Sequence, residues 1–384
     1  MSVRNLSQNL AEHIVIVGGG AIGLASAWAL CEKGVRVTVL EAGKAGEGAL
    51  WASGGMLAAG FETCFELDPA HPLAASYADF LGRSLRLWGD WAPTLQARSG
   101  QALGYDSQGS VTPAFTRAEM DRLDQAEALA KRFGIQATRV SGEALAHLEP
   151  ALAKSRCALT FPHDGQLDNR ALGRVLSDAV RSRGGEVVQQ RRVTGLDRSA
   201  GQVRGVVLET GERLAADAVI LATGAERFAD MPAFATMTPV KGQMIRFESS
   251  DLAAPKRVVR GLSIYLAAKS GGRLIAGASS EPGERAQETD PDTLERLKTA
   301  ACAAMPALAG RPVVESWAGL RPFSSDAMPI VGEAEPGLYL ALGAYRNGVL
   351  TAPGMAELLL QALGADPRTD LAKAFSPERP GLKA

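Results

Sequence analysis

The sequence is poor in cysteine, in histidine and in long runs of one charge. Its 384 residues include only four cysteines and four histidines, and the formal net charge is −1. The cysteines lie far apart, so there is no zinc-type spacing and no disulfide framework, and we expect a reducing cytoplasm and no metal site. Without a basic stretch, neither nucleic acid nor an anionic membrane surface is expected as a main partner.

An apolar segment of the kind that crosses a membrane is also missing. Residues 14–30 run for 17 positions without a charged side chain. This run includes three consecutive glycines, is slightly short for a bilayer crossing and lacks the basic start of a signal peptide. We therefore expect it to be neither an integral membrane segment nor a signal peptide.

What the sequence does contain is a glycine-rich turn near its beginning. Residues 14–17 are β-branched and apolar, which predicts a strand buried on both faces. Gly18, Gly20 and Gly23 then form G-x-G-x-x-G where a helix follows the strand. The first glycine permits a sharp turn, the second lets a pyrophosphate approach the backbone, and the third lets the helix pack closely on the sheet.

An acidic residue completes this unit. A second strand, predicted over residues 36–40, ends at Glu41, whose carboxylate can accept hydrogen bonds from an adenosine ribose. Strand, helix, strand and acid all fall where a βαβ unit of ~30 residues needs them. The pattern predicts a bound dinucleotide, with a plain βαβ turn as the alternative, and by itself does not choose between NAD and FAD.

The rest of the chain alternates predicted helices and strands, and its length favours two domains. Apolar residues at helical spacing and short alternating runs give the expected elements. Helices are predicted over residues 74–91, 117–133, 169–183, 291–305 and 351–363, and strands over residues 186–190, 203–209, 218–222, 239–247, 263–268, 273–278, 313–320 and 338–342.

Several segments between these elements carry further expectations. Residues 53–56 are expected to open a helix or turn beneath a flat ring, because small residues let a ligand approach the backbone. The turn at residues 222–225 is either a second closure on the dinucleotide or a tight strand end. Arg321 is predicted to lie in a loop, and residues 380–381 in a frayed tail.

Five segments of the chain resemble the D-amino-acid oxidase superfamily of FAD-dependent amine oxidoreductases. They read EAGKAGEGALWASGGML, PVKGQMIRF, GGRLIAGAS, ESWAGLRPFSSDAMPIVG and GAYRNGVLTAP. Within the superfamily the chain is most similar to the glycine oxidase branch, flavoenzymes of thiamine biosynthesis. The resemblance implies an α/β fold (α+β overall), in which a Rossmann-like FAD-binding domain interleaves with an antiparallel-sheet substrate domain. It assigns residues 1–85, 148–230 and 318–384 to the former, and residues 86–147 and 231–317 to the latter.

The resemblance implies which residues contact FAD. They lie in the glycine turn, after the second strand, in the residue 49–56 segment, at isolated positions in the middle of the chain, and before and within the last helix. The residues are Gly18, Gly20, Ala21, Ile22, Gly23, Glu41, Ala42, Ala49, Leu50, Ser53, Gly54, Gly55, Met56, Val193, Thr223, Gly224, Ala344, Tyr345, Arg346, Asn347, Gly348, Val349 and Leu350. The flavin is expected to be non-covalent, because Gly319 stands where covalent members carry a cysteine.

The resemblance also implies three catalytic residues. Arg321 matches an arginine that holds the substrate carboxylate as a bidentate fork, which lysine cannot reproduce. Arg346 matches a second position at the same carboxylate, and Tyr265 a tyrosine that closes the site. A structural salt bridge is the alternative for either arginine. Ser263 stands where one branch of the family has a histidine, which leaves substrate choice open.

The implied reaction is oxidative deamination of glycine or another small amino acid or secondary amine. Hydride passes to flavin N5, the imine hydrolyses to a 2-oxo acid and ammonia, and oxygen reoxidises the flavin to give hydrogen peroxide. The alternatives are a D-amino-acid dehydrogenase that reduces quinone, a sarcosine or imino-acid oxidase, an RNA-modifying oxidase module and a flavoprotein without catalysis. A homo-oligomer is possible.

Overall fold

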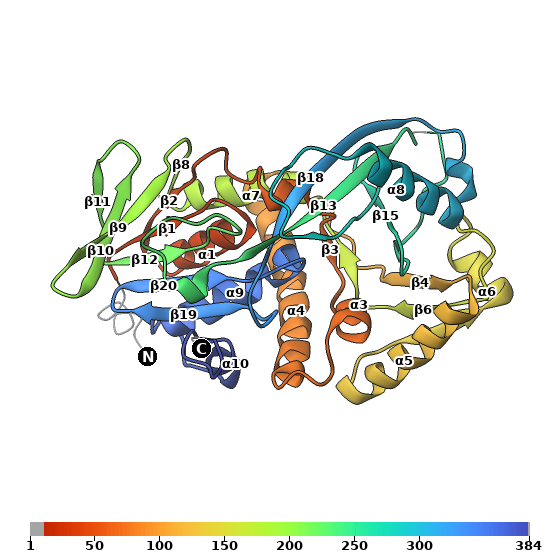
Figure 1. The fold of residues 1–384 in the computed structure, drawn as a ribbon, viewed down its shortest axis with the longest axis horizontal. Helices are drawn as coiled ribbons and strands as arrows, with labels where there is room; N and C mark the ends of the chain where they lie inside the picture. Colours follow the sequence, from red (N-terminus) through yellow and green to blue (C-terminus); the bar gives the residue numbers. More distant parts are fainter. Residues whose placement is uncertain (1–10, 250, 383–384) are drawn as a thin grey trace.

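The computed structural model describes residues 11–249 and 251–382. Figure 1 shows two sheets at opposite ends of an elongated molecule, with helix α4 (Ala74–Ser99) standing between them. The chain passes between the two sheets several times, so segments far apart in sequence share each sheet. This mixed α/β arrangement confirms the predicted fold class.

The first sheet has six strands in the order β19-β20-β12-β1-β2-β8. Neighbours from β20 to β8 pair in parallel, and only β19 is antiparallel. The central strand is fully buried, as the β-branched run requires of a strand covered on both faces. The strands are β1 (His13–Val17), β2 (Arg36–Leu40), β8 (Glu186–Val188), β12 (Ala218–Leu221), β19 (Ile330–Glu335) and β20 (Leu338–Leu342).

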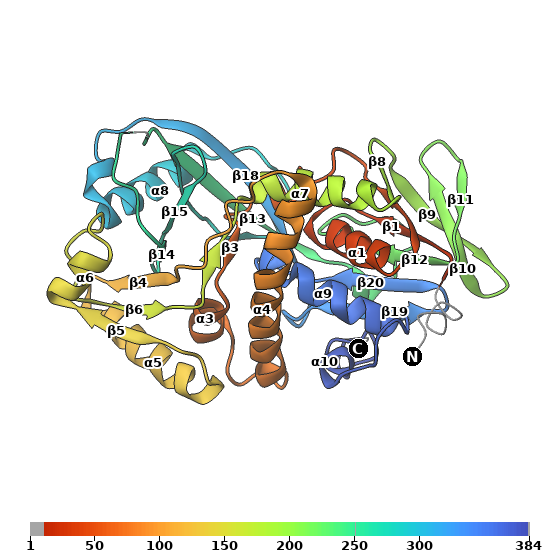
Figure 2. The ribbon, with the colours of Figure 1, turned by 180° about the vertical axis from the view of Figure 1, so that it is seen from behind.

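Helices cover this sheet. α1 (Ala21–Glu32) packs against α7 (Asn169–Ser182) and α9 (Gly348–Ala362), and α4 packs against both of these. Figure 2 shows α4, α7 and α9 together on the near side of the molecule. α1 is apolar almost all round, which agrees with its position between the sheet and two other helices.

The second sheet has nine strands, in the order β17-β13-β16-β15-β14-β4-β6-β5, with β18 paired to β13. Only the β14–β4 pair is parallel. Its strands are β4 (Ser110–Ala114), β5 (Thr138–Ser141), β6 (Cys157–Phe161), β13 (Thr238–Phe247), β14 (Val258–Arg260), β15 (Tyr265–Lys269), β16 (Arg273–Gly277), β17 (Glu281–Pro282) and β18 (Val313–Phe323). The helices at this end are α5 (Arg117–Phe133), α6 (Gly142–Leu148) and α8 (Pro291–Ala304).

Smaller elements complete the fold. β9, β10 and β11 form a separate three-stranded sheet, and β3 pairs with β7. These strands are β3 (Met56–Leu57), β7 (Gly165–Gln166), β9 (Val193–Ser199), β10 (Gln202–Leu208) and β11 (Arg213–Ala215). The short helical elements are α2 (Ala49–Ala52), α3 (Ala59–Phe61), α10 (Asp370–Ala374), the π-helix η2 (Glu62–Glu66) and the 3₁₀ turns η3 (Ala233–Ala235) and η4 (Pro306–Leu308).

Most predicted elements are present, and the differences have physical causes. α4 continues past the predicted residue 91 to Ser99, because Pro93 is accommodated inside the helix. Of the helix or turn expected at residues 53–56 the structure has the turn, which leads from α2 into β3 at Met56. β18 continues through Arg321, so this arginine lies in a strand and not in the predicted loop.

The predicted frayed tail is wrong. Arg379 is only 6% exposed, and its guanidinium donates to the carboxylate of Asp326 and to the backbone oxygen of Pro329 at 2.6 Å. Leu382 is 4% exposed. The ion pair of Arg379 and Asp326 therefore anchors the chain close to residues 380–381, and residues 383–384 lie outside the described residues.

The predicted domain boundaries stay a prediction. β6 lies in residues 148–230, which were assigned to the FAD-binding domain, yet it pairs with β4 and β5 in the nine-stranded sheet. β18 begins before the predicted boundary at residue 318 and continues past it.

Lys269, at the end of β15, is a buried cation with neutral partners. Its Nζ donates to Gln166 Oε1 and to the backbone oxygen of Leu167, both at 2.9 Å. Burial lowers the pKa of Lys269 to about 7. Between that value and the ordinary lysine range the unfolded chain binds more protons than the folded chain, so folding stability rises with pH.

We expect Lys269→Met to remove this pH dependence. From pH 7 to 9 the unfolding free energy of the wild type should gain about 2 kcal/mol over that of the variant. Urea denaturation at pH 7, 8 and 9 measures the difference. Lys44→Met, at an exposed lysine, is the control and should run parallel to the wild type. A constant offset between Lys269→Met and wild type at all three pH values would contradict the shifted pKa.

Candidate active site

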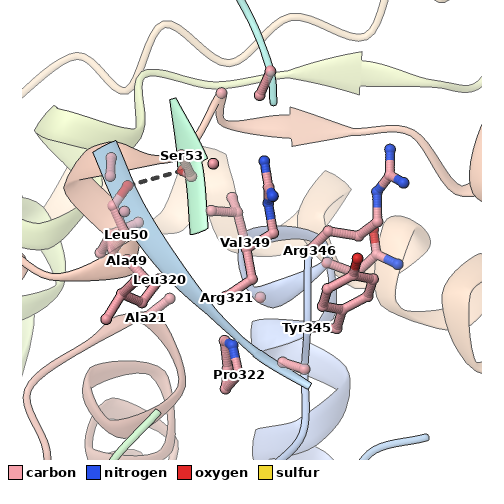
Figure 3. Close-up of a pocket in the computed structure, with 18 of the residues that line it drawn as sticks. Ala21, Ala49, Leu50, Ser53, Leu320, Arg321, Pro322, Tyr345, Arg346 and Val349 are labelled. Carbon is pink, nitrogen blue, oxygen red and sulfur yellow. Dashed lines mark hydrogen bonds between the residues drawn. The ribbon is translucent and has the colours of Figure 1, made fainter. Parts of the chain in front are cut away.

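The two sheets share one elongated cavity with a volume of about 460 Å³, within the usual range for cofactor and small-ligand sites. Its walls come from the glycine turn, from α2 and the turn after it, from the start of α9, and from the inner face of the nine-stranded sheet. In Figure 3 Ala21, Ala49 and Leu50 lie toward one side of the cavity, and Tyr345 and Arg346 toward the other.

The glycine turn closes the cavity at the end of β1. Gly18 has a φ of +109°, and a β-carbon there would lie 2.4 Å from the backbone oxygen of Ala222. A β-carbon at Gly23 would lie 1.9 Å from the backbone oxygen of Gly18, whereas one at Gly20 would meet no protein atom within 4 Å. α1 begins at this open position without a capping side chain, so its first N–H groups are free to bind a phosphate.

Glu41 follows β2 at the same edge of the sheet. Its carboxylate accepts hydrogen bonds from the backbone amides of Gly19 at 2.8 Å and Gly43 at 2.7 Å. In open α/β sheets ligands bind beyond the carboxyl ends of the parallel strands, which is where this carboxylate lies. Glu41 therefore lies beside the glycine turn, as predicted.

The turn after α2 is held by backbone hydrogen bonds. Ser53 Oγ donates to the backbone oxygen of Leu50 at 2.8 Å, as Figure 3 shows, and accepts from the amide of Gly55 at 3.3 Å. The Leu167 amide donates to the Gly55 oxygen at 2.8 Å. Asn169 Nδ2 donates to the Leu50 oxygen at 3.0 Å. Gly54 and Gly55 carry no side chains and line the cavity, so the backbone of this turn is open to a ligand.

α9 begins at the cavity. Asn347 is its N-cap residue but does not cap the helix, because its Nδ2 donates instead to Glu62 Oε2 at 3.3 Å and to the Tyr77 hydroxyl at 3.1 Å. The first N–H groups of α9 therefore have no side-chain acceptor. Gly348 and Val349, predicted as a loop before the helix, form its first turn.

Most predicted cofactor residues line the cavity. Four do not: Gly23 packs α1 against the turn, Leu350 is buried in the core, Val193 starts β9 with 7% exposure, and Ala42 lies outside the wall. The residues that line it are Gly18, Gly20, Ala21, Ile22, Glu41, Ala49, Leu50, Ser53, Gly54, Gly55, Met56, Thr223, Gly224, Ala344, Tyr345, Arg346, Asn347, Gly348 and Val349.

Arg321 is a partly buried cation in the wall of the cavity that the nine-stranded sheet forms. Its Nη1 donates to the backbone oxygen of Ser279 at 3.1 Å, and a β-carbon at Gly242 would lie 2.1 Å from Nη2. Burial, together with the charge of Arg346, lowers the pKa of Arg321, but a guanidinium stays protonated. Within the described residues no carboxylate forms an ion pair with it, so its charge is available to an anionic ligand.

Arg346 differs from Arg321 because it already has carboxylate partners. Its Nη1 lies 2.7 Å from Glu66 Oε2, and its Nε lies 3.4 Å from Glu62 Oε2. Burial opposes its positive charge, but these two carboxylates raise the pKa of Arg346 overall. Contact of Arg346 with a substrate carboxylate stays a prediction, and the ion pairs show that the salt-bridge alternative is present as well.

Tyr265 stands on the floor of the cavity. Its hydroxyl lies 2.9 Å from Met244 Sδ, and a β-carbon at Gly54 would lie 2.9 Å from the same hydroxyl. Burial raises the pKa of Tyr265, so the phenol is neutral near pH 7. Its position between the nine-stranded sheet and the turn at residues 53–56 agrees with the predicted role in closing the site.

The sequence analysis missed four charged or aromatic residues of this end of the cavity: Arg260, Glu62, Glu66 and Phe61. Arg260 Nη2 donates to Glu62 Oε1 at 2.7 Å, and both side chains are buried. The sequence holds a weak signal for Arg260. An arginine directly after two valines in a short apolar strand indicates a buried position, not an exposed edge. The π-helix that turns Glu62 and Glu66 toward Arg346 leaves no such signal.

The residues present fit an FAD molecule. At one end the open backbone at Gly20 and the uncapped start of α1 suit a pyrophosphate. The turn at residues 53–56 and the uncapped start of α9 also line the cavity and offer backbone groups to the rest of the cofactor. Among the described residues no group of three or more histidine, cysteine, aspartate or glutamate side chains is placed to hold a metal ion.

The position and construction of this cavity define a dinucleotide-binding oxidoreductase. A family model described as FAD dependent oxidoreductase (DAO) matches residues 13–362. The chain belongs to this DAO family, whose cofactor is FAD, and the predicted family and cofactor are confirmed. No helix in residues 11–249 or 251–382 has both the length and the apolar character needed to cross a membrane.

Relatives and solved structures agree with the family. A glycine oxidase of Pseudomonas putida is 30% identical over 383 residues, which are 96% of this chain and 99% of that protein. The bifunctional protein ThiO/ThiG of Nostoc sp. is 33% identical over 357 residues, and the chain spans about half the length of this relative, 52%. The crystal structure of glycine oxidase from Geobacillus kaustophilus superposes with a TM-score of 0.84 at 30% identity and covers 96% of this chain and 98% of that one.

We expect Gly23→Ala to abolish most FAD binding, because the new methyl group would displace the backbone of the glycine turn. The ratio of flavin absorbance to protein absorbance in the purified variant measures this loss. Gly89→Ala in α4 is the matched control, since a β-carbon there meets nothing within 4 Å. A Gly23→Ala protein with a full complement of flavin would contradict the proposed pyrophosphate site.

Proposed function

We propose that this chain is an FAD-dependent amine oxidoreductase that oxidises glycine or another small amino acid or secondary amine. The observation that carries the proposal is the partly buried Arg321 in the cavity wall, whose charge has no carboxylate partner among the described residues. A guanidinium that is largely removed from water and has no carboxylate partner favours an anionic ligand, and a carboxylate fits its fork. The relatives named glycine oxidase and ThiO/ThiG support this substrate class.

The chain's own part in the reaction is to bind and orient the substrate. The backbone oxygen of Ser279 and the absence of a side chain at Gly242 hold the guanidinium of Arg321 in one place. A carboxylate bound there in bidentate fashion has a fixed orientation, which fixes the α-carbon as well. FAD, when bound, supplies the acceptor for the hydride of that carbon.

No side chain in the cavity is needed as a base. None of the four histidines lines the cavity, and the raised pKa of Tyr265 keeps its phenol protonated. The carboxylates of Glu62 and Glu66 are held in ion pairs with Arg260 and Arg346. The substrate amine therefore reacts in its neutral form, and positioning supplies most of the reduction in the barrier. Water then hydrolyses the imine product to a 2-oxo acid and ammonia.

The cofactor contacts and the electron acceptor belong to the same proposal. The predicted residues that line the cavity would hold FAD without a covalent bond, and oxygen would accept the electrons to give hydrogen peroxide. The competing function is a dehydrogenase that passes electrons to quinone. Hydrogen peroxide released in air in step with ammonia supports the oxidase, whereas flavin reduction by substrate without peroxide supports the dehydrogenase.

The test of the substrate class is a panel of glycine, sarcosine, D-alanine and larger D-amino acids. Rapid mixing of each with the oxidised holoenzyme follows the loss of flavin absorbance, and this readout does not depend on the final acceptor. Reduction by at least one small amine, with saturation, is the expected result. No reduction by any member of the panel would overturn the proposal.

We expect Arg321→Ala to lower kcat/KM. The loss in transition-state stabilisation should be about 2–5 kcal/mol, the scale for a charge pair that loses one partner. Arg321→Lys should recover only a small part, because an ammonium cannot reproduce the bidentate fork. The flavin content of both variants should equal that of the wild type. Equal kcat/KM in Arg321→Ala and wild type would show that the carboxylate binds elsewhere.

A further inference from the structure

Four residues stand opposite one another across four neighbouring strands of the nine-stranded sheet. Arg260 of β14 pairs with Tyr265 of β15, Tyr265 with Gly277 of β16, and Gly277 with Met244 of β13. Directly opposed residues point to the same face of a sheet, and all four line the cavity. Arg260 is therefore at one end of this row. Met244 is at the other end, on β13, which pairs with the strand β18 that carries Arg321.

The side chain of Arg260 fills its end of the row. The residue is 3% exposed. Its guanidinium carbon lies 4.0 Å from the ring centroid of Phe61 and 5.6 Å from that of Tyr265, so the group lies against both aromatic rings. Tyr265 points the other way, over the position of Gly277, where its hydroxyl lies 2.9 Å from Met244 Sδ.

The hydrogen-bond donors of Arg260 are not presented to the cavity. Nη2 donates to Glu62 Oε1 at 2.7 Å, and Nη1 lies 3.4 Å from Met56 Sδ. Nε is shielded from solvent and has no partner among the described residues. The charge of Arg260 is balanced by Glu62, which is itself 5% exposed. Arg260 thus closes the cavity as a neutralised, rigid wall, and does not act as a second site for anions.

The free charge lies beside the other end of the row, two residues along β13 from Met244. The guanidinium of Arg321 lies over Gly242 of β13, and β13 is three strand spacings from β14, about 14 Å. Tyr265 stands between, and Arg260 fills the outer part of this distance. A ligand whose carboxylate is bound by Arg321 and whose side chain extends along the row meets Tyr265 and then the guanidinium of Arg260.

We propose that Arg260 is a specificity-determining residue that limits the size of the substrate side chain to about that of glycine or alanine. This inference rests on the proposed function, since it places the substrate carboxylate on Arg321. The wall works by the volume of the side chain. It excludes larger amino acids because their side chains overlap the guanidinium between Phe61 and Tyr265.

The experiment compares Arg260→Ala with Arg260→Met. In Arg260→Ala the ratio of kcat/KM for D-valine to that for glycine should rise by about 10- to 100-fold, the range that a few methylene groups command in a pocket. Arg260→Met removes the charge but keeps most of the length, so its ratio should stay within about threefold of the wild type. An equally large rise of this ratio in Arg260→Met would show that the charge of Arg260, not its volume, limits the substrate, and would contradict the proposal.

The matched control is Arg257→Ala. Arg257 lies three positions earlier in the chain, outside the cavity, and its Nη1 is 3.3 Å from Oε1 of Glu149, which is 1% exposed. This variant also deprives a buried carboxylate of its arginine. Its substrate ratio should equal that of the wild type, and a rise equal to that of Arg260→Ala would mean that general loosening, not the wall, changes selectivity.

A binding series separates this inference from the proposed function. Acetate, propionate, butyrate and hexanoate are titrated into each holoenzyme and followed by the shift in flavin absorbance, which needs no turnover. Wild type should lose affinity beyond propionate, while Arg260→Ala should bind all four. If this pattern appears but no amine is oxidised, the proposed function fails and the wall stands. If amines are oxidised and wild type and Arg260→Ala bind the four carboxylates alike, Arg260 does not limit the size of the substrate.

Discussion

The pairing of β13 with β18 is the constraint on which the rest of the structure depends. The ladder runs from Thr238 opposite Phe323 to Phe247 opposite Val313. It brings Arg321 over Gly242, and the Trp317 indole at its middle donates to the backbone oxygen of Ala52 at 3.0 Å. Because α2 also lines the cavity, this one ladder fixes the distance between Arg321 and the wall that we propose for FAD.

Charge balance explains how the inner end of the cavity can be both buried and selective. Arg260 and Arg346 are neutralised by Glu62 and Glu66, whereas the described residues leave Arg321 uncompensated. Burying an unpaired charge is costly, so the folded protein gains most from a ligand that brings a single negative charge to that position. The same balance underlies the two roles that we propose, a wall for Arg260 and a binding group for Arg321, although the two side chains are chemically identical.

Local pattern predicted the N-terminal βαβ unit, the hairpin of β15 and β16 and most helices, because each depends on neighbours in the sequence. α5 is an example, since its capping box of Thr116 and Glu119 marks the start that the periodicity gives. The sequence pattern gave wrong predictions where contacts between distant segments of the chain determine the structure. Arg321 and Pro322 resemble a loop, but the β13 ladder extends through them. Likewise the last residues are anchored by the ion pair of Arg379 and Asp326, which are far apart in the chain.

By itself the sequence determined the class of cofactor and the side chains available for catalysis, since glycine spacing and residue type are local properties. The glycine turn could not be told from that of an NAD protein on its own, and the resemblance of later segments to a flavoprotein family decided for FAD. Only the tertiary structure decided which arginine is free. Arg260, Arg321 and Arg346 cannot be ranked by sequence, because the carboxylates that neutralise two of them come from a π-helix about 200–280 positions earlier, and only folding brings those charges together.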